Sequence, residues 1–325
     1  MTIDIHAHCL PQEVLDAARN EAHRFPSINI IQDDDGVALS FAGNPPTRPV
    51  NSRLRRHPPR LEWMRERGID TQLVGGWLDA FGYELEPHEG ADWSRFTNEH
   101  TRTACAALNG VISLATVPMQ DGRLAAAVLT EAVAAGMPGA MVGTQPYGNH
   151  GNLDDPQLDP FWETAAELGV PIIIHPMFGS QDARLQDFEM MNAVGRVSDV
   201  TTAISRLLFS GHLLRYEGLV VIASTGGGAL PYMLGRLGRN HAAFPGRFAD
   251  PVEGFSKLYF DSLVFQTDVL KFLVSKVGAN RVMLGSDYPF PIGDPNPRNI
   301  IETAGFEQAD VELMLGGVAR ELFRL

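Results

Sequence analysis

Short apolar runs alternate with longer amphipathic stretches along almost the whole chain. The short runs have the length and composition of buried strands, and the longer stretches have the period of surface helices. Strands are predicted at 2–5, 71–75, 111–117, 139–142, 171–174, 219–223, 258–261 and 281–284. Helices are predicted at 60–67, 122–135, 159–168, 200–213, 230–237, 267–277 and 307–323. Eight strands that alternate with helices predict a (β/α)8 TIM barrel, whose active site lies at the carboxyl ends of the strands.

Two stretches interrupt this alternation. Residues 27–53 hold two apolar runs around an Asp-Gly pair, which predicts a small β-hairpin insertion that we expect over the mouth of the barrel. Residues 79–94 are interpreted as an irregular segment whose larger side chains line the entrance, namely Phe81, Tyr83, His88 and Trp93. Because no repeat or low-complexity linker divides the chain, we expect one domain over residues 1–325.

Composition and charge narrow the classes of function. The net charge of −13 and the absence of a basic tract argue against nucleic acid as a partner. No apolar run approaches the roughly 18 residues that span a bilayer, so no membrane partner is expected. Cys9 and Cys105 supply no disulfide framework, and Met1 leads straight into the first predicted strand without a signal peptide. These features predict a cytoplasmic location.

Four residues of metal-ligand type stand where predicted strands end. His6 and His8 lie in IDIHAHCLP, His175 in PIIIHP and Asp287 in MLGSDYPFP. Alternation along a strand places His6 and His8 on one face, so both can reach the same ion. Imidazole and carboxylate together suit Zn²⁺ and neighbouring divalent ions. The pattern therefore predicts a metalloenzyme that uses Zn²⁺ or another divalent metal such as Mn²⁺.

Longer motifs carry a family resemblance: IDIHAHCLP, PIIIHPMF, TTAISRLLFSG, GGGALPYMLGRL and LYFDSLVF with VMLGSDYPFPIGD. Together they resemble the amidohydrolase superfamily, in particular its 2-amino-3-carboxymuconate-6-semialdehyde decarboxylase branch. The resemblance extends from Ile3 to about Glu302. It implies a homodimeric barrel with one divalent ion, usually Zn²⁺, at His6, His8, His175 and Asp287. It also implies nonoxidative decarboxylation of a small aromatic or muconate-type carboxylic acid, with Asp287 as ligand, as proton relay or as both.

The chain departs from this branch at one catalytic position. The relatives carry a histidine general base just before the glycine triplet, whereas VVIASTGGGALP has Thr225 there. A threonine hydroxyl does not ionise near pH 7 and cannot replace that base. His150, in the loop after the fourth predicted strand, is a candidate substitute. Three explanations stay open: an enzyme with a different base, an engineered inactive variant, or a binding protein without catalysis. The alternative activity is hydrolysis of an amide, a lactone or a carbon–carbon bond.

Substrate recognition is predicted from chemistry and placement. A carboxylate calls for a guanidinium, and the resemblance favours Arg53 among the arginines of RPVNSRLRRHPPR. Asn192 stands where the muconate decarboxylase has a tryptophan, which argues for a different substrate. Phe178 and Trp77 are predicted as apolar walls of the site.

Overall fold

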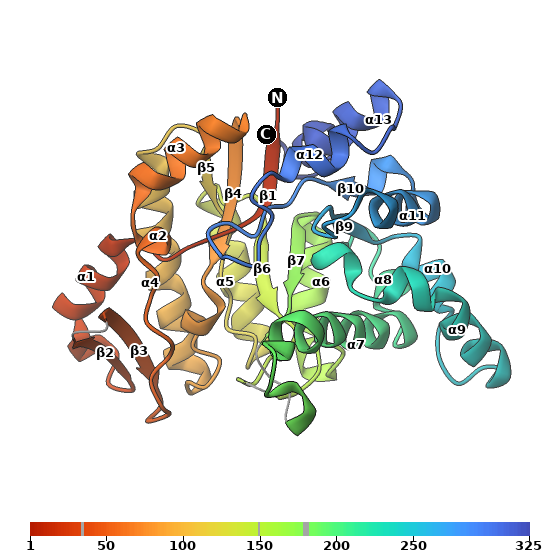
Figure 1. The fold of residues 1–325 in the computed structure, drawn as a ribbon. Helices are drawn as coiled ribbons and strands as arrows, with labels where there is room; N and C mark the ends of the chain where they lie inside the picture. The colour runs from red at the N-terminus through yellow and green to blue at the C-terminus, as the bar shows by residue number, and fades with distance from the viewer. Residues whose placement is uncertain (34–35, 149, 178–181) are drawn as a thin grey trace.

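The computed structural model describes residues 1–33, 36–148, 150–177 and 182–325. Parallel strands stand at its centre, and helices surround them (Figure 1). The central strands are β1 (Ile3–Cys9), β4 (Thr71–Gly76), β5 (Val111–Ser113), β6 (Ala140–Gly143), β7 (Pro171–His175), β8 (Val220–Ala223), β9 (Tyr259–Asp261) and β10 (Val282–Met283). All eight predicted strands are confirmed. Their ends differ from the prediction by up to four residues.

These strands follow one another around a barrel. One parallel sheet has the order β1-β4-β5 and the other has the order β10-β9-β8-β7-β6. A bridge from Ala115 to Ala140 joins β5 to β6. The Ile5 amide donates to the Leu284 carbonyl at 2.9 Å, which joins β1 to the end of β10. The predicted TIM barrel is therefore confirmed.

Helices alternate with the strands, as the apolar periodicity predicts. Their bounds are α1 (Gln12–Asn20), α2 (Ser52–Arg55), α3 (His57–Arg67), α4 (Pro87–Ala106), α5 (Gly122–Ala134), α6 (Asp159–Leu168), α7 (Arg196–Phe209), α8 (His212–Arg215), α9 (Leu230–Ala243), α10 (Pro251–Phe255), α11 (Thr267–Val277), α12 (Pro297–Glu302), α13 (Gln308–Glu312) and α14 (Val318–Leu322). Local signals set several of these ends. The Asp121 carboxylate caps α5 by accepting from the amides of Arg123 and Leu124, and Gly169 ends α6 at a φ of +58°. None of the helices within the described ranges is long and apolar enough to cross a membrane.

The prediction of an irregular segment over residues 79–94 is wrong. Its second half belongs to α4, which begins at Pro87, where the missing amide hydrogen costs no intrahelical bond. Phe81, Tyr83 and Trp93 are buried in the core and do not line an entrance, and the Trp93 indole donates to the Ala80 carbonyl at 2.8 Å. The helix was missed because polar residues and a glycine interrupt its apolar period.

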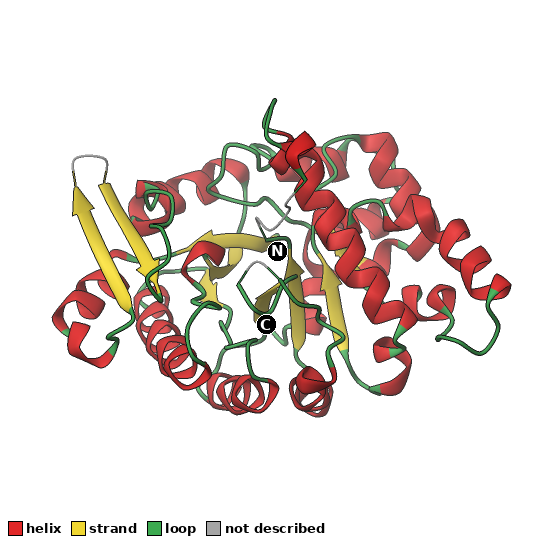
Figure 2. Cartoon of the chain, turned by 90° about the horizontal axis from the view of Figure 1, so that it is seen from below, coloured by secondary structure: helices red, strands yellow, loops and turns green. Residues whose placement is uncertain are grey.

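The predicted hairpin exists, as β2 (Ile28–Asp33) paired antiparallel with β3 (Gly36–Phe41). Its turn lies outside the described residues. The hairpin is at the side of the barrel and not over its centre (Figure 2), where Phe25, Trp93 and Phe96 pack with it between α1 and α4. The end of β3 and the loop after it line a cavity on the active-site face, through Phe41, Asn44, Pro45, Thr47 and Arg48. The expected position over the mouth is therefore wrong for the strands themselves.

Candidate metal centre and active site

Three histidines and one aspartate meet at the carboxyl ends of three barrel strands. His6 and His8 lie on β1, His175 ends β7, and Asp287 follows β10. One ligand atom from each of these buried residues lies within 4.8 Å of the other three. The distance from Asp287 Oδ1 is 3.1 Å to His8 Nε2 and 3.6 Å to His6 Nε2. The structure thus brings together all four residues predicted from the strand ends.

The second nitrogen of each imidazole has its own partner. His6 Nδ1 lies 2.6 Å from Asp261 Oδ2, His8 Nδ1 lies 3.1 Å from the Gly76 carbonyl, and His175 Nδ1 lies 2.9 Å from the Pro176 carbonyl. All three partners are acceptors, so each Nδ1 carries the hydrogen and each Nε2 keeps a lone pair for a metal. This pattern of partners is typical of histidines that ligate through Nε2.

The centre passes a direct test of fit for a divalent ion. The Nε2 atoms of His6 and His8 and the Oδ1 atom of Asp287 are buried and make no hydrogen bond with any of the described residues. Buried polar atoms without partners are costly, and three that converge on one point are explained by a cation between them. Imidazole nitrogens with one carboxylate oxygen form the donor set of Zn²⁺ and related first-row ions.

The protonation states favour ligation. Burial lowers the pKa of His8 and holds that of His175 well below its ordinary value, so both imidazoles are neutral at pH 7. Burial also raises the pKa of Asp287, but the close imidazoles of His8 and His6 and the Arg196 guanidinium outweigh it, and the net shift is downward. Burial has the largest single effect on the pKa of His6 and lowers it, but the bond to Asp261 and the charges of the neighbouring aspartates together raise it by more. Asp287 therefore remains ionised within the ligand set.

Asp261 is a part of the centre that the sequence analysis missed. It ends β9, it is fully buried, and it accepts from His6 Nδ1 and from three backbone amides. Two of those amides belong to Thr225 and Gly226, at 2.9 and 2.7 Å. One carboxylate thus orients a predicted metal ligand and fixes the glycine loop after β8. An aspartate at a strand end is the same signal that identified Asp287, so the sequence did contain it.

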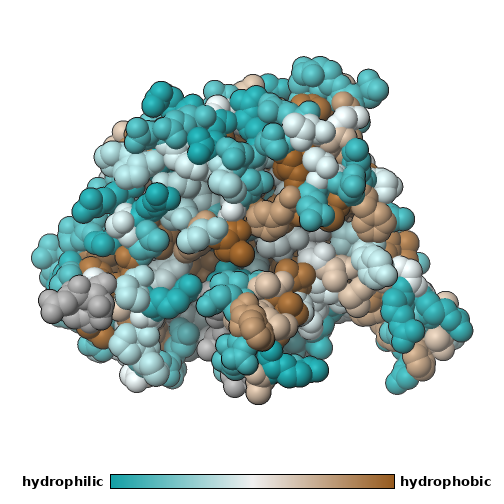
Figure 3. All heavy atoms as spheres, in the orientation of Figure 1, coloured by the Kyte–Doolittle hydropathy of each residue, from teal (hydrophilic) through white to brown (hydrophobic). Residues whose placement is uncertain are grey.

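A cavity of about 410 Å³ opens from the metal centre. His175, Asp287 and Thr225 line it. The larger apolar residues that line it are Leu263, Val264, Phe265, Val269 and Ile292. Asn192 and Arg196 are further polar residues of its lining. In Figure 3, apolar atoms gather at the middle of the face shown, between α7 and the segment that follows β10. The cavity therefore suits a ligand with an apolar body and a polar group.

The other predicted site residues lie in different places. Thr225 and Asn192 line this cavity, whereas His150 is exposed in the loop after β6 and packs near Tyr147. Arg53 is exposed on α2 and lines neither this cavity nor the adjacent one. Trp77 is buried in the cluster between α1, α4 and the hairpin. Phe178 lies outside the described residues. The roles predicted for these six residues stay predictions.

Comparisons with known proteins agree with this geometry. The family model described as Amidohydrolase matches residues 3–325. A 2-amino-3-carboxymuconate-6-semialdehyde decarboxylase from Dictyostelium discoideum is 31% identical over 286 residues, which cover 86% of this chain and 79% of that protein.

The chain belongs to the amidohydrolase family.

Solved structures share the fold of this amidohydrolase. A 5-carboxyvanillate decarboxylase from Sphingomonas paucimobilis superposes with a TM-score of 0.82 at 24% identity, over 100% of this chain and 99% of that one. A dihydroxybenzoic acid decarboxylase from Polaromonas sp. JS666, solved with manganese and the inhibitor 2-nitroresorcinol, gives a TM-score of 0.79 at 23% identity, over 100% of this chain and 97% of that one. The barrel fold of this chain is thus shared with these solved structures.

Proposed function

We propose that this amidohydrolase is a metal-dependent, nonoxidative decarboxylase of a small aromatic or muconate-type carboxylic acid. One observation carries the proposal: a single cavity joins the ligand cluster to an apolar wall and a guanidinium. Relatives named as decarboxylases of such acids, with matches that cover most of each chain, support it.

His6, His8, His175 and Asp287 are the residues that would hold the metal. We propose Zn²⁺ for this position, and Mn²⁺ is the alternative that two solved relatives of lower identity contain. A divalent ion bound there supplies a Lewis acid that orients an oxygen of the substrate and draws electron density from it. The buried imidazoles keep the site neutral enough to accept both the ion and an anionic acid.

Side chains of the protein account for the proton transfer and for the loss of CO₂. In the overall step a proton adds to the carbon that bears the carboxylate, and the carbon–carboxylate bond then breaks. Its electron pair restores the unsaturated system, and CO₂ leaves. Asp287, ionised and in the cavity, is the residue we assign to relay the proton. The apolar wall at Leu263 and Val264 disfavours the charge of the departing carboxylate and favours neutral CO₂.

Thr225 occupies the place of a base and cannot act as one. Its hydroxyl donates to the Ser224 carbonyl at 2.7 Å, and its φ of +53° lies in the left-handed region. That region is unfavourable for a β-branched residue and several times more common for histidine, asparagine and aspartate. The backbone at 225 therefore accepts a histidine without rearrangement, which makes Thr225→His a direct test of the missing base.

The test is release of CO₂ from a panel of hydroxybenzoates and muconate-type acids. Protein loaded with Zn²⁺ or Mn²⁺ is compared with Thr225→His and with Thr225→Asn, a control that suits the same backbone but supplies no base. Release by the unaltered protein or by the histidine variant supports the proposal. Hydrolysis of amides or lactones without CO₂ would contradict it in favour of a hydrolase, and tight binding without turnover in all variants would favour a binding protein.

We also propose a homodimer, as the family resemblance implies, and the cytoplasmic location predicted from the sequence. Light scattering of the metal-loaded protein tests the dimer, and fractionation of the source cells tests the location. A monomer at micromolar concentration would remove the dimer from the proposal without affecting the chemistry.

A further inference from the structure

Ser286 and Asp4 form a buried hydrogen bond between two segments that carry metal-type ligands, and the sequence predicted no role for either. Ser286 directly precedes Asp287, and Asp4 lies on β1 two residues before His6. We propose that Ser286 and Asp4 are positioning residues, which hold the turn that directs the Asp287 carboxylate toward the histidines. This inference rests on the metal centre of the proposed function and deepens it, because it names the residues that set the geometry of the ligands.

The backbone of Asp287 has a conformation that must be held from outside. Its φ of +58° lies in the left-handed region, which is uncommon for residues other than glycine. Such a conformation persists where the surrounding structure fixes it. In this conformation Asp287 Oδ1 lies 3.1 Å from His8 Nε2 and 3.6 Å from His6 Nε2. The contacts that hold this turn therefore set the distances between the ligand atoms.

The Ser286 hydroxyl connects the two sides of the turn. It donates to Asp4 Oδ2 at 2.6 Å, and it accepts from the Tyr288 amide at 3.0 Å. The Ser286 amide also donates to Asp4 Oδ1, at 3.1 Å. The residues before and after Asp287 are thus tied to one hydroxyl oxygen, and Asp4 attaches that oxygen to β1.

Asp4 links the same turn to the first histidine ligand. Besides the two bonds from Ser286, its carboxylate accepts from the His6 amide at 3.1 Å and from the Gln72 side chain at 2.8 Å. The side chains of Asp4 and Gln72 are fully buried, so these bonds do not compete with solvent. One carboxylate therefore fixes the backbone beside both His6 and Asp287.

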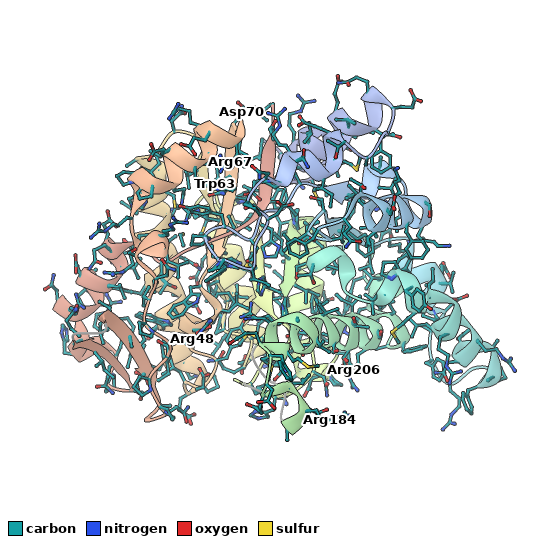
Figure 4. The ribbon with its side chains drawn as sticks, in the orientation of Figure 1. Arg48, Trp63, Arg67, Asp70, Arg184 and Arg206 are labelled. Atoms are coloured by element: carbon teal, nitrogen blue, oxygen red, sulfur yellow. The ribbon has the colours of Figure 1, made fainter. Side chains whose placement is uncertain are left out.

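Helix α3 supports this network from outside. Arg60 donates to the Gln72 side chain and to the His8 carbonyl, and its guanidinium lies 4.8 Å from the centroid of the Tyr288 ring. Trp63, labelled beside α3 in Figure 4, packs on the same ring with the two centroids 4.6 Å apart. These contacts fix Tyr288, which follows Asp287. The buried network thus reaches three of the four ligand residues.

Backbone bonds also reach the turn, and they define the alternative explanation. The Asp287 amide donates to the His6 carbonyl at 2.7 Å, and the His8 amide donates to the Tyr288 carbonyl at 2.8 Å. If these bonds were sufficient, loss of the Ser286 hydroxyl would leave the ligand geometry unchanged. If the hydroxyl holds the turn, its loss frees the Tyr288 amide and one partner of Asp4, and the Asp287 carboxylate shifts.

Binding of Co²⁺ distinguishes these explanations without a substrate. The visible absorption of bound Co²⁺ depends on the number and arrangement of its ligands, and a titration followed by absorbance gives the affinity. We expect Ser286→Ala to weaken Co²⁺ binding at least tenfold and to change the spectrum. Ser286→Thr keeps the hydroxyl and should restore both. Asp4→Asn should resemble Ser286→Ala, because an NH₂ group then faces two of the donors that bind Asp4.

Two further variants separate positioning from general stability. Ser40→Ala is the matched control, because the Ser40 hydroxyl is also buried and donates to the Asn44 carbonyl at 2.7 Å, away from the ligand cluster. It should lower the unfolding free energy in urea but leave the Co²⁺ spectrum unchanged. The double variant Ser286→Ala/Asp4→Asn should bind Co²⁺ about as weakly as the weaker single variant, because both changes break the same link.

Each other outcome overturns the inference or the metal centre itself. An unchanged spectrum and affinity in Ser286→Ala, or the same change in Ser40→Ala, would refute the positioning role. Binding by Ser286→Thr that is as weak as that of Ser286→Ala would refute the role of the hydroxyl, and unaltered binding by Asp4→Asn would refute that of Asp4. Failure of the unaltered protein to bind Co²⁺ or Zn²⁺ would overturn the metal centre and this inference together. The expected changes in a protein that releases no CO₂ would contradict the decarboxylation and support the positioning.

Discussion

Replacement of Asp261 by asparagine changes one oxygen to an NH₂ group and leaves the shape of the side chain intact. Every partner of this buried carboxylate is a donor. Oδ2 accepts from His6 Nδ1 at 2.6 Å and from the Thr225 amide at 2.9 Å, while Oδ1 accepts from the amides of Gly226 and Leu263 at 2.7 and 3.2 Å. Asparagine can accept on one side only, so in either orientation its NH₂ group faces two donors.

The size of the effect on stability and on metal affinity depends on which pair of donors loses its acceptor. If the NH₂ group faces the backbone amides, two buried donors lose their partner at about 1–3 kcal/mol each. If it faces His6, the imidazole accepts at Nδ1 and carries its hydrogen on Nε2, where it cannot bind a metal. Loss of such an orienting carboxylate typically weakens metal affinity 10- to 100-fold. We therefore expect metal affinity to fall at least tenfold and the metal-free protein to lose about 2–6 kcal/mol of unfolding free energy.

Two measurements on Asp261→Asn check these values. Competition with a chelating dye gives the metal affinity, and urea denaturation of the metal-free protein gives the unfolding free energy. Asp268→Asn is the control, because this substitution removes the same charge on the surface of α11, where the Asp268 side chain is 93% exposed. A metal affinity within twofold of the unaltered protein, together with unchanged stability, would refute the assignment of Asp261 as the group that orients His6 and the glycine loop.

Three further predictions concern stability. Arg60→Met should cost about 3–5 kcal/mol by urea denaturation, because this buried guanidinium donates to Gln72 Oε1 and to the His8 carbonyl, both at 2.5 Å, whereas the exposed Arg123→Met should cost little. Burial lowers the pKa of His212 to about 4. As the pH falls, His212 is therefore protonated near pH 6.5 in the unfolded chain but only near pH 4 in the folded chain. His212 should therefore remove at most about 3 kcal/mol of stability as pH falls from 6.5 to 4, and a His212→Gln variant should show a flatter decline. Metal removal by a chelator should lower the melting temperature, and Zn²⁺ or Mn²⁺ should restore it; about 4 kcal/mol is expected at a metal concentration 1,000 times Kd.

The barrel could be predicted because its strands are short buried runs that alternate with helices. The same reasoning placed the four metal-type ligands, since polar residues at the ends of parallel strands must meet at one face. It failed for α4, where polar residues within the helix hide the apolar period. The position of the hairpin was also out of reach, because packing of Phe25 and Trp93 sets it and neither residue belongs to the strands.

The parts of the site on loops were harder to predict. Arg53 is in a basic segment with several arginines, and nothing local indicates which of them faces a cavity. Arg196 reaches the site because α7 begins beside the end of β7, a relation between elements that sequence periodicity cannot supply. Thr225 was identified by family resemblance, and the structure adds that its side chain lines the cavity.

The loop at Thr225 is tied to β9 by two of its backbone amides. Asp261 accepts from the amides of Thr225 and Gly226, and these bonds persist whichever side chain stands at 225. These bonds to β9 hold the backbone at 225, whose φ is left-handed, and residue 225 lines the same cavity as Asp287. At position 225, the side chain can therefore be changed while the backbone keeps its conformation. Substitution there changes the group offered to the substrate, while substitution at Asp261 changes the geometry that presents it, so the two variants test the base and its support independently.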